Sequence, residues 1–371
     1  MLIGVPKEIK NHEYRVGMTP ESVSSAVAHG HSVMVQSDAG IGIGADDATY
    51  LKAGADIIAD AADIFAAAEM IVKVKEPQAI ERAMLRKNQI LYTYLHLAPD
   101  PEQTKDLIAS GAHCIAYETI TDNHGALPLL KPMSQVAGRL SIQAGAYALE
   151  KSHGGLGVLL GGVPGVAPAK VVILGGGVVG FNAAQMAVGV QADVTILDTN
   201  PMTIESLSNH FGNTAKVIHS NAGIMRDYVL AADLVIGAVL VAGAAAPKLV
   251  TKDMLSQMKD GAVLVDVAID QGGCFETSHA TTHADPIYEI DGVVHYCVAN
   301  MPGAVPRTST YALNNATLPH LLAIADKGWK KALTDDQNLK NGLNVSGGKV
   351  TYEAVAEELG YDFISPDSVI S

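Results

Sequence analysis

The stretch "LGGGVVG" (Leu174–Gly180) decides the fold of the middle of the chain. An apolar run, "KVVI" (Lys170–Ile173), precedes it, and a helix-like stretch, "FNAAQMAVGVQ", follows it. Gly175, Gly177 and Gly180 fit the spacing G-x-G-x-x-G. The first glycine allows a tight turn, the second lets backbone N–H groups approach a pyrophosphate, and the third lets helix and strand touch. The helix N-terminus adds N–H donors and partial positive charge, so the stretch predicts a dinucleotide site.

The next predicted strand, "ADVTILD" (Ala192–Asp198), supplies the second part of this pattern. Asp198 stands about 20 residues beyond the glycines, where an acidic residue accepts hydrogen bonds from the ribose hydroxyls. The same carboxylate would repel the 2′-phosphate of NADP. Taken alone, Asp198 is better explained as a solvated carboxylate at a strand end. Together with the glycines it predicts NAD as the cofactor.

Composition indicates a globular protein with two domains. The chain has 371 residues, with 39 acidic and 25 basic side chains and a net charge of −14,. No Lys/Arg cluster occurs, so nucleic acid and acidic membranes are poor candidate partners. The cysteines Cys114, Cys274 and Cys297 are odd in number and far apart, which favours a reducing cytoplasm over a disulfide framework,. The start lacks a signal peptide, and the longest apolar run, 234–247, is too short to span a bilayer.

Strand-like and helix-like runs alternate along the chain, which is typical of an α/β fold with mainly parallel sheets. We expect two Rossmann-like lobes. A doubly wound parallel NAD-binding sheet, residues 131–307, is inserted in a discontinuous α/β substrate domain, residues 1–130 and 308–371. Long helices are expected over Met133–Lys151 and from about Tyr311, and a terminal helix over 347–360. The expected strands are Ser32–Ser37, Met70–Lys75, Gln89–Leu95, Lys170–Gly175, Asp193–Asp198, Asp233–Val239, Ala262–Ala268 and Val293–Ala299.

The first lobe offers cations and an acid/base group for a small polar substrate. Arg15 lies in a stretch bounded by Gly and Pro, and Lys73 and Lys75 alternate on one face of a predicted strand. His96 follows the apolar run "ILYTYL". Each has an ordinary structural interpretation, such as a surface cation or an edge-strand lysine. Catalytic groups gather at the carboxyl ends of strands, which favours Lys75 and His96.

In the middle lobe, polar residues follow two predicted strands. Asp266 and Asp270 come after an apolar run and precede glycines, which suits a cofactor crevice as well as a plain turn,. Asn300 and Met301 follow the last strand, where a nicotinamide amide could bind. The pair His279 and His283 lacks a helical pattern and a complete ligand set, so no metal site is expected.

Seven long motifs, in the same order along the chain, resemble alanine dehydrogenases of the alanine dehydrogenase/pyridine nucleotide transhydrogenase family. The resemblance runs from Met1 to the C-terminal segment and is far more specific than the glycine spacing. The motifs are "GVPKEIKNHEYRVGMTP", "KVKEP", "YLHLA", "VVILGGGVVG…VTILD", "VDVAIDQGGCFET", "VANMPGAVPRTSTYALNNAT" and "KVTYEAVAEELGY".

The resemblance implies an NAD-dependent oxidoreductase that reversibly deaminates L-alanine to pyruvate and ammonia, with hydride transfer in a cleft between two lobes. It implies that Arg15 and Lys75 bind the substrate and that His96 and Asp270 are catalytic. It also implies a homohexamer acting in L-alanine catabolism. The cofactor residues that it implies, together with neighbours of the same motifs, are Ser134, Gly175, Gly177, Val178, Val179, Gly180, Asp198, Ser220, Val239, Leu240, Ile269, Asn300 and Met301.

Ala245 departs from the family pattern, where a lysine is expected, and this concerns only a loop near the cofactor. One alternative function is the NAD(H)-binding subunit of a transhydrogenase, which needs neither His96 nor Asp270. Another is a non-catalytic NAD-binding protein of the same fold. The sequence leaves open the preference for alanine over serine or 2-aminobutyrate and the physiological direction of the reaction.

Overall fold

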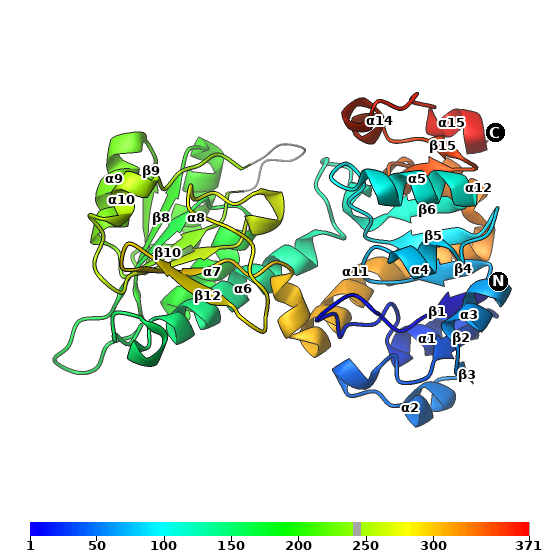
Figure 1. Cartoon of the computed structure of the whole chain (residues 1–371), viewed down its shortest axis with the longest axis horizontal. Coiled ribbons are helices and arrows are strands. Elements are labelled where there is room, and N and C mark those ends of the chain that lie inside the picture. The colour runs from blue at the N-terminus through cyan, green and yellow to red at the C-terminus, as the bar shows by residue number, and fades with distance from the viewer. Residues whose placement is uncertain (240–245, 371) are drawn as a thin grey trace. The chain divides into compact units, whose positions relative to one another are not determined.

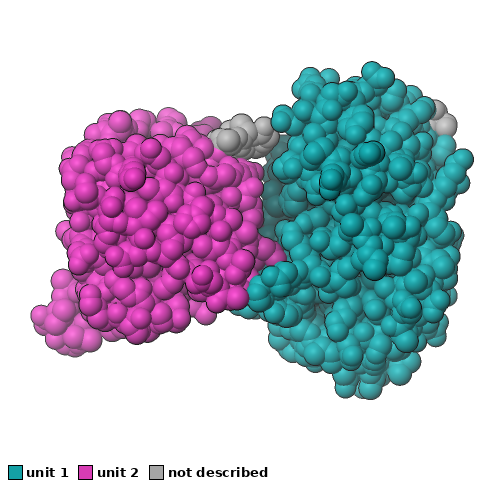
Figure 2. Space-filling model, viewed as in Figure 1, with its two compact units in different colours: residues 1–133, 303–371 teal, residues 134–302 magenta. Residues whose placement is uncertain are grey.

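The computed structural model describes residues 1–239 and 246–370, which form two compact units (Figures 1 and 2). Unit 1 comprises Met1–Met133 and Gly303–Ser371, and unit 2 comprises Ser134–Pro302. Each unit contains one mainly parallel sheet with helices. The predicted α/β fold is confirmed.

Unit 1 is built on an eight-stranded sheet with the order β15-β14-β6-β5-β4-β1-β2-β3. Strands β1 to β6 are parallel, whereas β14 pairs antiparallel with β6 and with β15. Every residue of β4, β5 and β6 is buried, as expected for parallel strands covered on both faces,. The strands are β1 (Leu2–Val5), β2 (Ser32–Gln36), β3 (Asp56–Ile58), β4 (Met70–Val72), β5 (Ile90–Thr93), β6 (His113–Ala116), β14 (Leu343–Ser346) and β15 (Lys349–Val350).

The helices of unit 1 precede and follow these strands along the chain. Several begin at a side-chain cap, for example Thr19 for α1 and Asp100 for α5,. They are α1 (Pro20–Ala28), α2 (Asp47–Lys52), α3 (Ala61–Ala67), α4 (Ala79–Arg82), α5 (Pro101–Ser110), α11 (Pro306–Lys327), α12 (Trp329–Asp335), α13 (Gln337–Lys340), α14 (Glu353–Leu359) and α15 (Pro366–Ile370), with 3₁₀ turns at Ile41–Ile43 and Tyr117–Thr119.

Unit 2 is built on a seven-stranded sheet with the order β12-β13-β11-β10-β7-β8-β9. All neighbours are parallel except β12, which pairs antiparallel with β13 at the edge. The strands are β7 (Lys170–Leu174), β8 (Asp193–Asp198), β9 (Lys216–His219), β10 (Leu234–Gly237), β11 (Val263–Asp266), β12 (Ile287–Ile290) and β13 (Val293–Tyr296). The helices are α6 (Lys131–Ala148), α7 (Val178–Gly189), α8 (Pro201–Phe211), α9 (Ala222–Ala231) and α10 (Lys252–Leu255), with 3₁₀ turns at Lys151–His153, Ile269–Gln271 and Met301–Ala304.

Small residues let α6 pack closely in unit 2. A Cβ on Gly138 would lie 2.2 Å from the carbonyl oxygen of Val179 on α7. A Cβ on Gly145 would lie 2.6 Å from the Leu234 side chain of β10. Helix and sheet therefore approach at a distance that a larger residue would prevent.

Both sheets reverse their strand order once. In unit 1 the chain starts at β1, steps outward to β2 and β3, and returns to β4 on the other side of β1. In unit 2 it starts at β7, steps to β8 and β9, and returns to β10 beside β7. Ligands of open α/β sheets bind at such switch points, outside the carboxyl ends of the strands. Ligand sites are therefore expected at two edges, after β1 and β4 in unit 1 and after β7 and β10 in unit 2,.

Two local expectations are wrong. The strand expected over Met70–Lys75 ends at Val72, because the Glu8 side chain, not a neighbouring strand, accepts the N–H of Val74. The alternation argument for Lys73 and Lys75 therefore does not apply. The segment expected as one terminal helix begins with β15, which pairs with β14, and only Glu353–Leu359 is helical.

Among the described residues, no helix combines the length and the apolar composition needed to cross a membrane.

Candidate functional site

The carboxyl edge of the unit 2 sheet gathers most of the residues expected to bind the cofactor. Because the strands are parallel, their carboxyl ends meet at one edge. An expected residue lies at or just beyond the end of each parallel strand. These are Gly175 after β7, Asp198 at the end of β8, Ser220 after β9, Val239 after β10, Ile269 after β11 and Asn300 after β13.

The glycine turn has the shape that a pyrophosphate needs. Gly175 has a φ of +95°, which side chains rarely adopt, and a Cβ on Gly180 would lie 1.8 Å from the Gly175 carbonyl oxygen. By contrast, no described heavy atom lies within 4 Å of a Cβ built on Gly177. No described side chain caps the N-terminus of α7, which begins at Val178. Gly175 and Gly180 are thus glycines for backbone reasons, whereas Gly177 leaves room and N–H donors for a phosphate.

Asp198 is held in place by the main chain. Its carboxylate accepts hydrogen bonds from the N–H of Gly176 at 2.6 Å and of Asn200 at 2.7 Å. The N–H of Ser220 donates to the Asp198 carbonyl oxygen at 2.8 Å, which joins the ends of β8 and β9. The carboxylate therefore lies against the glycine turn, as a ribose-binding group must.

The other expected cofactor residues differ in exposure. Val178 is 39% exposed at the start of α7, whereas Val179 is 8% exposed and packs inside. Ser134 is half-buried on α6, and Ile269 is buried. Leu240 and Ala245 lie outside the described residues.

The aspartate that ends β11 and the one four residues after it differ in burial and in partners. Asp266 is completely buried, and its carboxylate accepts hydrogen bonds from the N–H groups of Ala268 (3.1 Å) and Cys274 (2.9 Å) and from the Ser278 hydroxyl (2.5 Å). Asp266 therefore ties both ends of the loop that carries Asp270. Asp270 is exposed in the 3₁₀ turn Ile269–Gln271, so it is the aspartate that can meet a ligand.

Asn300 and the histidine pair belong to one end of unit 2. Asn300 has a φ of +61°, an uncommon conformation for a residue with a side chain, and Met301 beside it is 3% exposed,. His283 Nε2 lies 3.2 Å from the Asn300 carbonyl oxygen, and His279 stacks on Tyr288 with ring centroids 3.7 Å apart. Among the described residues, no group of three or more His, Cys, Asp or Glu side chains is arranged to hold a metal.

In unit 1, Arg15 is a buried cation, only 2% exposed. Two nitrogens of the Arg15 guanidinium donate hydrogen bonds to the Glu13 carboxylate, Nε at 2.6 Å and Nη2 at 2.5 Å. The third nitrogen, Nη1, lies 3.0 Å from the sulfur of Met133. Burial alone would lower the pKa of Arg15, but the hydrogen bonds and charge of Glu13 outweigh it and raise that pKa,. The bidentate pair fixes the plane of the guanidinium.

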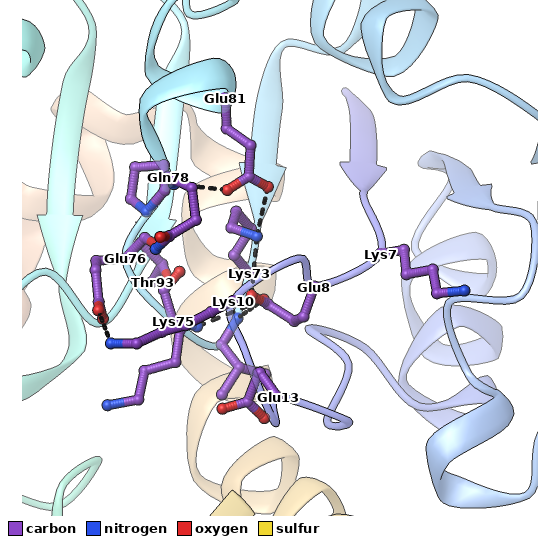
Figure 3. A network of polar contacts seen from close by, with 12 residues as sticks. Lys7, Glu8, Lys10, Glu13, Lys73, Lys75, Glu76, Gln78, Glu81 and Thr93 are labelled. Atoms are coloured by element: carbon purple, nitrogen blue, oxygen red, sulfur yellow. Dashed lines mark hydrogen bonds and ion pairs between the residues drawn. The ribbon is translucent and has the colours of Figure 1, made fainter. Parts of the chain in front are cut away.

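Lys75 follows β4 at the switch point of unit 1, among several charged side chains (Figure 3). Lys73 is completely buried between Glu8, at 2.9 Å, and Glu81, at 2.7 Å. Figure 3 shows Lys75 extending away from Lys73 and from both of these glutamates. Lys73 is therefore an internal structural cation, and Lys75, which is half-buried, is the lysine that can meet a ligand.

His96 lies beyond the end of β5 with a φ of +51°. Glu118 accepts the N–H of His96 at 2.6 Å and that of Leu95 at 3.1 Å, which holds this uncommon backbone conformation,. The His96 ring stacks on Tyr94, with centroids 5.8 Å apart and planes 6° apart, and its side chain is 43% exposed. Its Nδ1 lies 3.9 Å from Glu118 Oε1. The ring is thus oriented from one side and accessible from the other.

Sequence reasoning missed the carboxylates that hold these groups. They share one property, that each accepts hydrogen bonds from a residue expected in the site or from its immediate neighbours. Glu8 and Glu13 precede Arg15 in a stretch where basic and acidic side chains alternate, and this alternation of charge was a usable signal. No comparable signal in the sequence pointed to Glu81 or Glu118. The missed residues are Glu8, Glu13, Glu81 and Glu118.

We predict that Glu13→Ala destabilises unit 1, because it leaves the buried guanidinium of Arg15 without its bidentate carboxylate. Removing one partner of such a pair costs about 3–5 kcal/mol. The free energy of unfolding in urea measures this loss. Glu357→Ala, at an exposed position on α14, is the control and is expected to change it by less than about 0.5 kcal/mol,. Equal stabilities of the two variants would contradict the prediction.

Comparison with known proteins agrees with this geometry. Residues 4–137 match the family described as "Alanine dehydrogenase/PNT, N-terminal domain", and residues 141–353 match its C-terminal domain. The chain is 60% identical to an alanine dehydrogenase of Halomonas elongata, with 100% of both chains covered. It is 55% identical to an alanine dehydrogenase of Bacillus subtilis, covering 100% of this chain and 98% of the relative.

Two solved structures are also similar. An L-alanine dehydrogenase matches with a TM-score of 0.94 and 52% identity, covering 97% of this chain and 99% of the other. A transhydrogenase from Sinorhizobium meliloti matches with a TM-score of 0.82 and 26% identity, covering 95% and 100%. The chain therefore belongs to the alanine dehydrogenase/PNT family.

Proposed function

We propose that the chain is an NAD-dependent L-alanine dehydrogenase. It would convert L-alanine, water and NAD⁺ into pyruvate, ammonium, NADH and a proton, and run the reverse reaction when ammonium and pyruvate are abundant. The observation that carries the proposal is the edge of the unit 1 sheet. There Arg15, Lys75 and His96 follow the strands of one parallel sheet, each oriented by a carboxylate or by the main chain.

Arg15 and Lys75 would bind the carboxylate of alanine or pyruvate. A guanidinium held in a fixed plane offers N–H groups in a defined direction, and an ammonium adds a compact positive charge. Together they would orient the small substrate by the one group that alanine and pyruvate share. This orientation places the α-carbon for reaction and contributes to the rate through positioning.

His96 would move the protons of the reaction. In the reductive direction ammonia adds to the carbonyl carbon of pyruvate, and the resulting alkoxide takes a proton from the protonated imidazole. In the oxidative direction the imidazole accepts a proton from the water that attacks the imine carbon. An imidazole suits both steps because it gains and loses a proton near neutral pH.

Asp270 would stabilise the positive charge of the iminium. This charge develops on the substrate nitrogen when water leaves the carbinolamine, and a nearby carboxylate lowers the energy of that state. The Asp266 network would keep the Asp270 loop in place during this step.

The unit 2 edge fits a dinucleotide, with Gly177 and the start of α7 suited to the pyrophosphate and Asp198 to the ribose. When bound, NAD⁺ supplies the acceptor for the hydride of the α-carbon. Asn300 and Met301 would contact the nicotinamide end. The resemblance to the family implies further cofactor contacts from Ser134, Val178, Val179, Ser220, Val239, Leu240 and Ile269.

The first test is NADH formation from L-alanine and NAD⁺ at mildly alkaline pH. We expect the native chain to be active and Asp270→Asn to lower kcat by about a hundredfold or more, because it removes the charge that stabilises the iminium. Asp285→Asn, an exposed aspartate of the same unit, is the control and is expected to keep native activity.

A native protein that binds NADH but does not oxidise alanine would contradict the proposal. The transhydrogenase-like function would then be preferred, although the similarity to that class is weaker, at 26% identity against 52%.

We further predict that Asp198 selects NAD over NADP. The carboxylate would repel the 2′-phosphate, so Asp198→Ser is expected to raise kcat/KM for NADP⁺ relative to NAD⁺ by about tenfold or more. Steady-state kinetics with both cofactors measures the ratio. Asp193→Ser, at the opposite end of β8, is the control and is expected to leave the ratio unchanged.

We also propose that the protein self-associates as a homohexamer in the cytoplasm. Three apolar side chains of the segment 159–166 are more than half exposed, namely Leu159 (67%), Val163 (54%) and Val166 (64%), which is unusual for a monomer surface,. Light scattering is expected to give about six times the 38.7 kDa chain mass, and a monomeric mass would contradict this proposal.

The three cysteines are free and buried, and burial raises the pKa of Cys114 to about 12 and that of Cys297 to about 11, which suits a reducing compartment.

A further inference from the structure

Glu8 joins the two strands at the switch point of unit 1 (Figure 3). It lies in the segment after β1, and its partners lie in the segment after β4. One carboxylate oxygen, Oε1, accepts the N–H of Val74 at 2.7 Å and that of Lys75 at 3.4 Å. The other oxygen, Oε2, accepts a hydrogen bond from the Lys73 ammonium at 2.9 Å.

The Glu8 carboxylate is itself held from the opposite side. Lys73 is completely buried and also pairs with Glu81 Oε1 at 2.7 Å, while Glu81 Oε2 accepts the N–H of Gln78 at 2.7 Å. Burial alone would lower the pKa of Lys73, but the charges of Glu8 and Glu81 outweigh it and raise that pKa. Each oxygen of the two glutamates has a hydrogen-bond partner, as a buried charged network requires.

Other residues also hold the main chain around Lys75. The hydroxyl of Thr93, a buried residue at the end of β5, donates to the Lys75 carbonyl oxygen at 3.0 Å. The N–H of Tyr94 donates to the Val74 carbonyl oxygen at 3.3 Å. The following residue, Glu76, forms an ion pair with Lys10. The main chain from which the Lys75 side chain extends is therefore held in place, although β4 has already ended.

We infer that Glu8 is a positioning residue for Lys75, acting through the two main-chain hydrogen bonds rather than through its charge; this inference rests on the proposed function. A lysine side chain is a flexible stem with a point charge at its end, so only its origin can be fixed by the fold. A cation that is displaced from its place binds and orients the substrate carboxylate less well. Glu8 keeps the origin of that stem in place.

The competing explanation is that Glu8 only neutralises the buried Lys73. Two variants separate these explanations. Glu8→Asp keeps the charge but is one methylene shorter, so it cannot reach Lys73 and both N–H groups together. Glu8→Gln loses the charge but keeps the length and an oxygen that can accept the two N–H bonds.

We expect Glu8→Asp to raise the KM for pyruvate by roughly tenfold, with the KM for NADH unchanged. We expect Glu8→Gln to raise the KM for pyruvate by less than Glu8→Asp does. A larger effect of Gln than of Asp, or a fall in kcat alone with an unchanged KM for pyruvate, would overturn the inference. Glu69→Gln is the matched control, because Glu69 also accepts a main-chain N–H, that of Leu2 in β1 at 2.6 Å, but at the amino end of the sheet.

A second measurement needs no variant at the site. Hydrogen exchange of the native protein is expected to show the Val74 and Lys75 amides protected as strongly as those inside β4, and rapid exchange of both would overturn the inference.

The activity of the native enzyme in the kinetic assay separates the proposed function from the role of Glu8. Failure of the native chain to reduce pyruvate contradicts the proposed function, whereas an active native chain with a Glu8→Asp variant of unchanged KM contradicts only the role of Glu8.

Discussion

Parallel strands bring all their carboxyl ends to one edge of a sheet, and this constraint underlies both halves of the structure. Each sheet reverses its strand order once, between β1 and β4 in unit 1 and between β7 and β10 in unit 2. At a reversal the two connections leave in opposite directions, so main-chain groups and side chains at the strand ends remain available to a ligand. Nearly every residue of the proposed reaction ends a strand or lies in the segment after one, so this geometry decides where these residues lie.

The two edges satisfy this constraint by different chemistry. In unit 2 the turn after β7 consists of glycines, and its N–H groups are left for an anion or bonded to Asp198. In unit 1 two N–H groups after β4, those of Val74 and Lys75, are bonded to Glu8, which in turn needs the buried cation Lys73. A charged network in unit 1 thus holds the main chain after β4, whereas in unit 2 the Asp198 carboxylate holds the glycine turn after β7. In the proposed function, unit 1 would therefore offer cations to the substrate, whereas unit 2 would offer backbone donors to the cofactor.

Backbone strain marks two of the residues that we assign to the reaction. His96 and Asn300 both have a positive φ, +51° and +61°. Each is held by a neighbour, His96 by the Glu118 carboxylate and Asn300 by a contact of its carbonyl oxygen with His283. Such conformations persist only where the surroundings enforce them, and they concentrate at functional positions. Five other described non-glycine residues also have a positive φ, so the conformation supports these assignments without carrying them.

The amino-acid sequence alone determined the fold class and the family, because these depend on patterns along the chain, and the resemblance to that family supplied the reacting groups that we propose. The glycine spacing, the alternation of strands and helices and the order of long motifs can each be read over a few tens of residues. It did not determine where β4 ends, which of Lys73 and Lys75 is internal, or which carboxylates hold the cations. Glu8 and Lys73 are 65 residues apart in the chain, and Glu118 and His96 are 22 apart. They meet only because β1 neighbours β4 and β5 neighbours β6, so these charge pairs were decided by the tertiary structure.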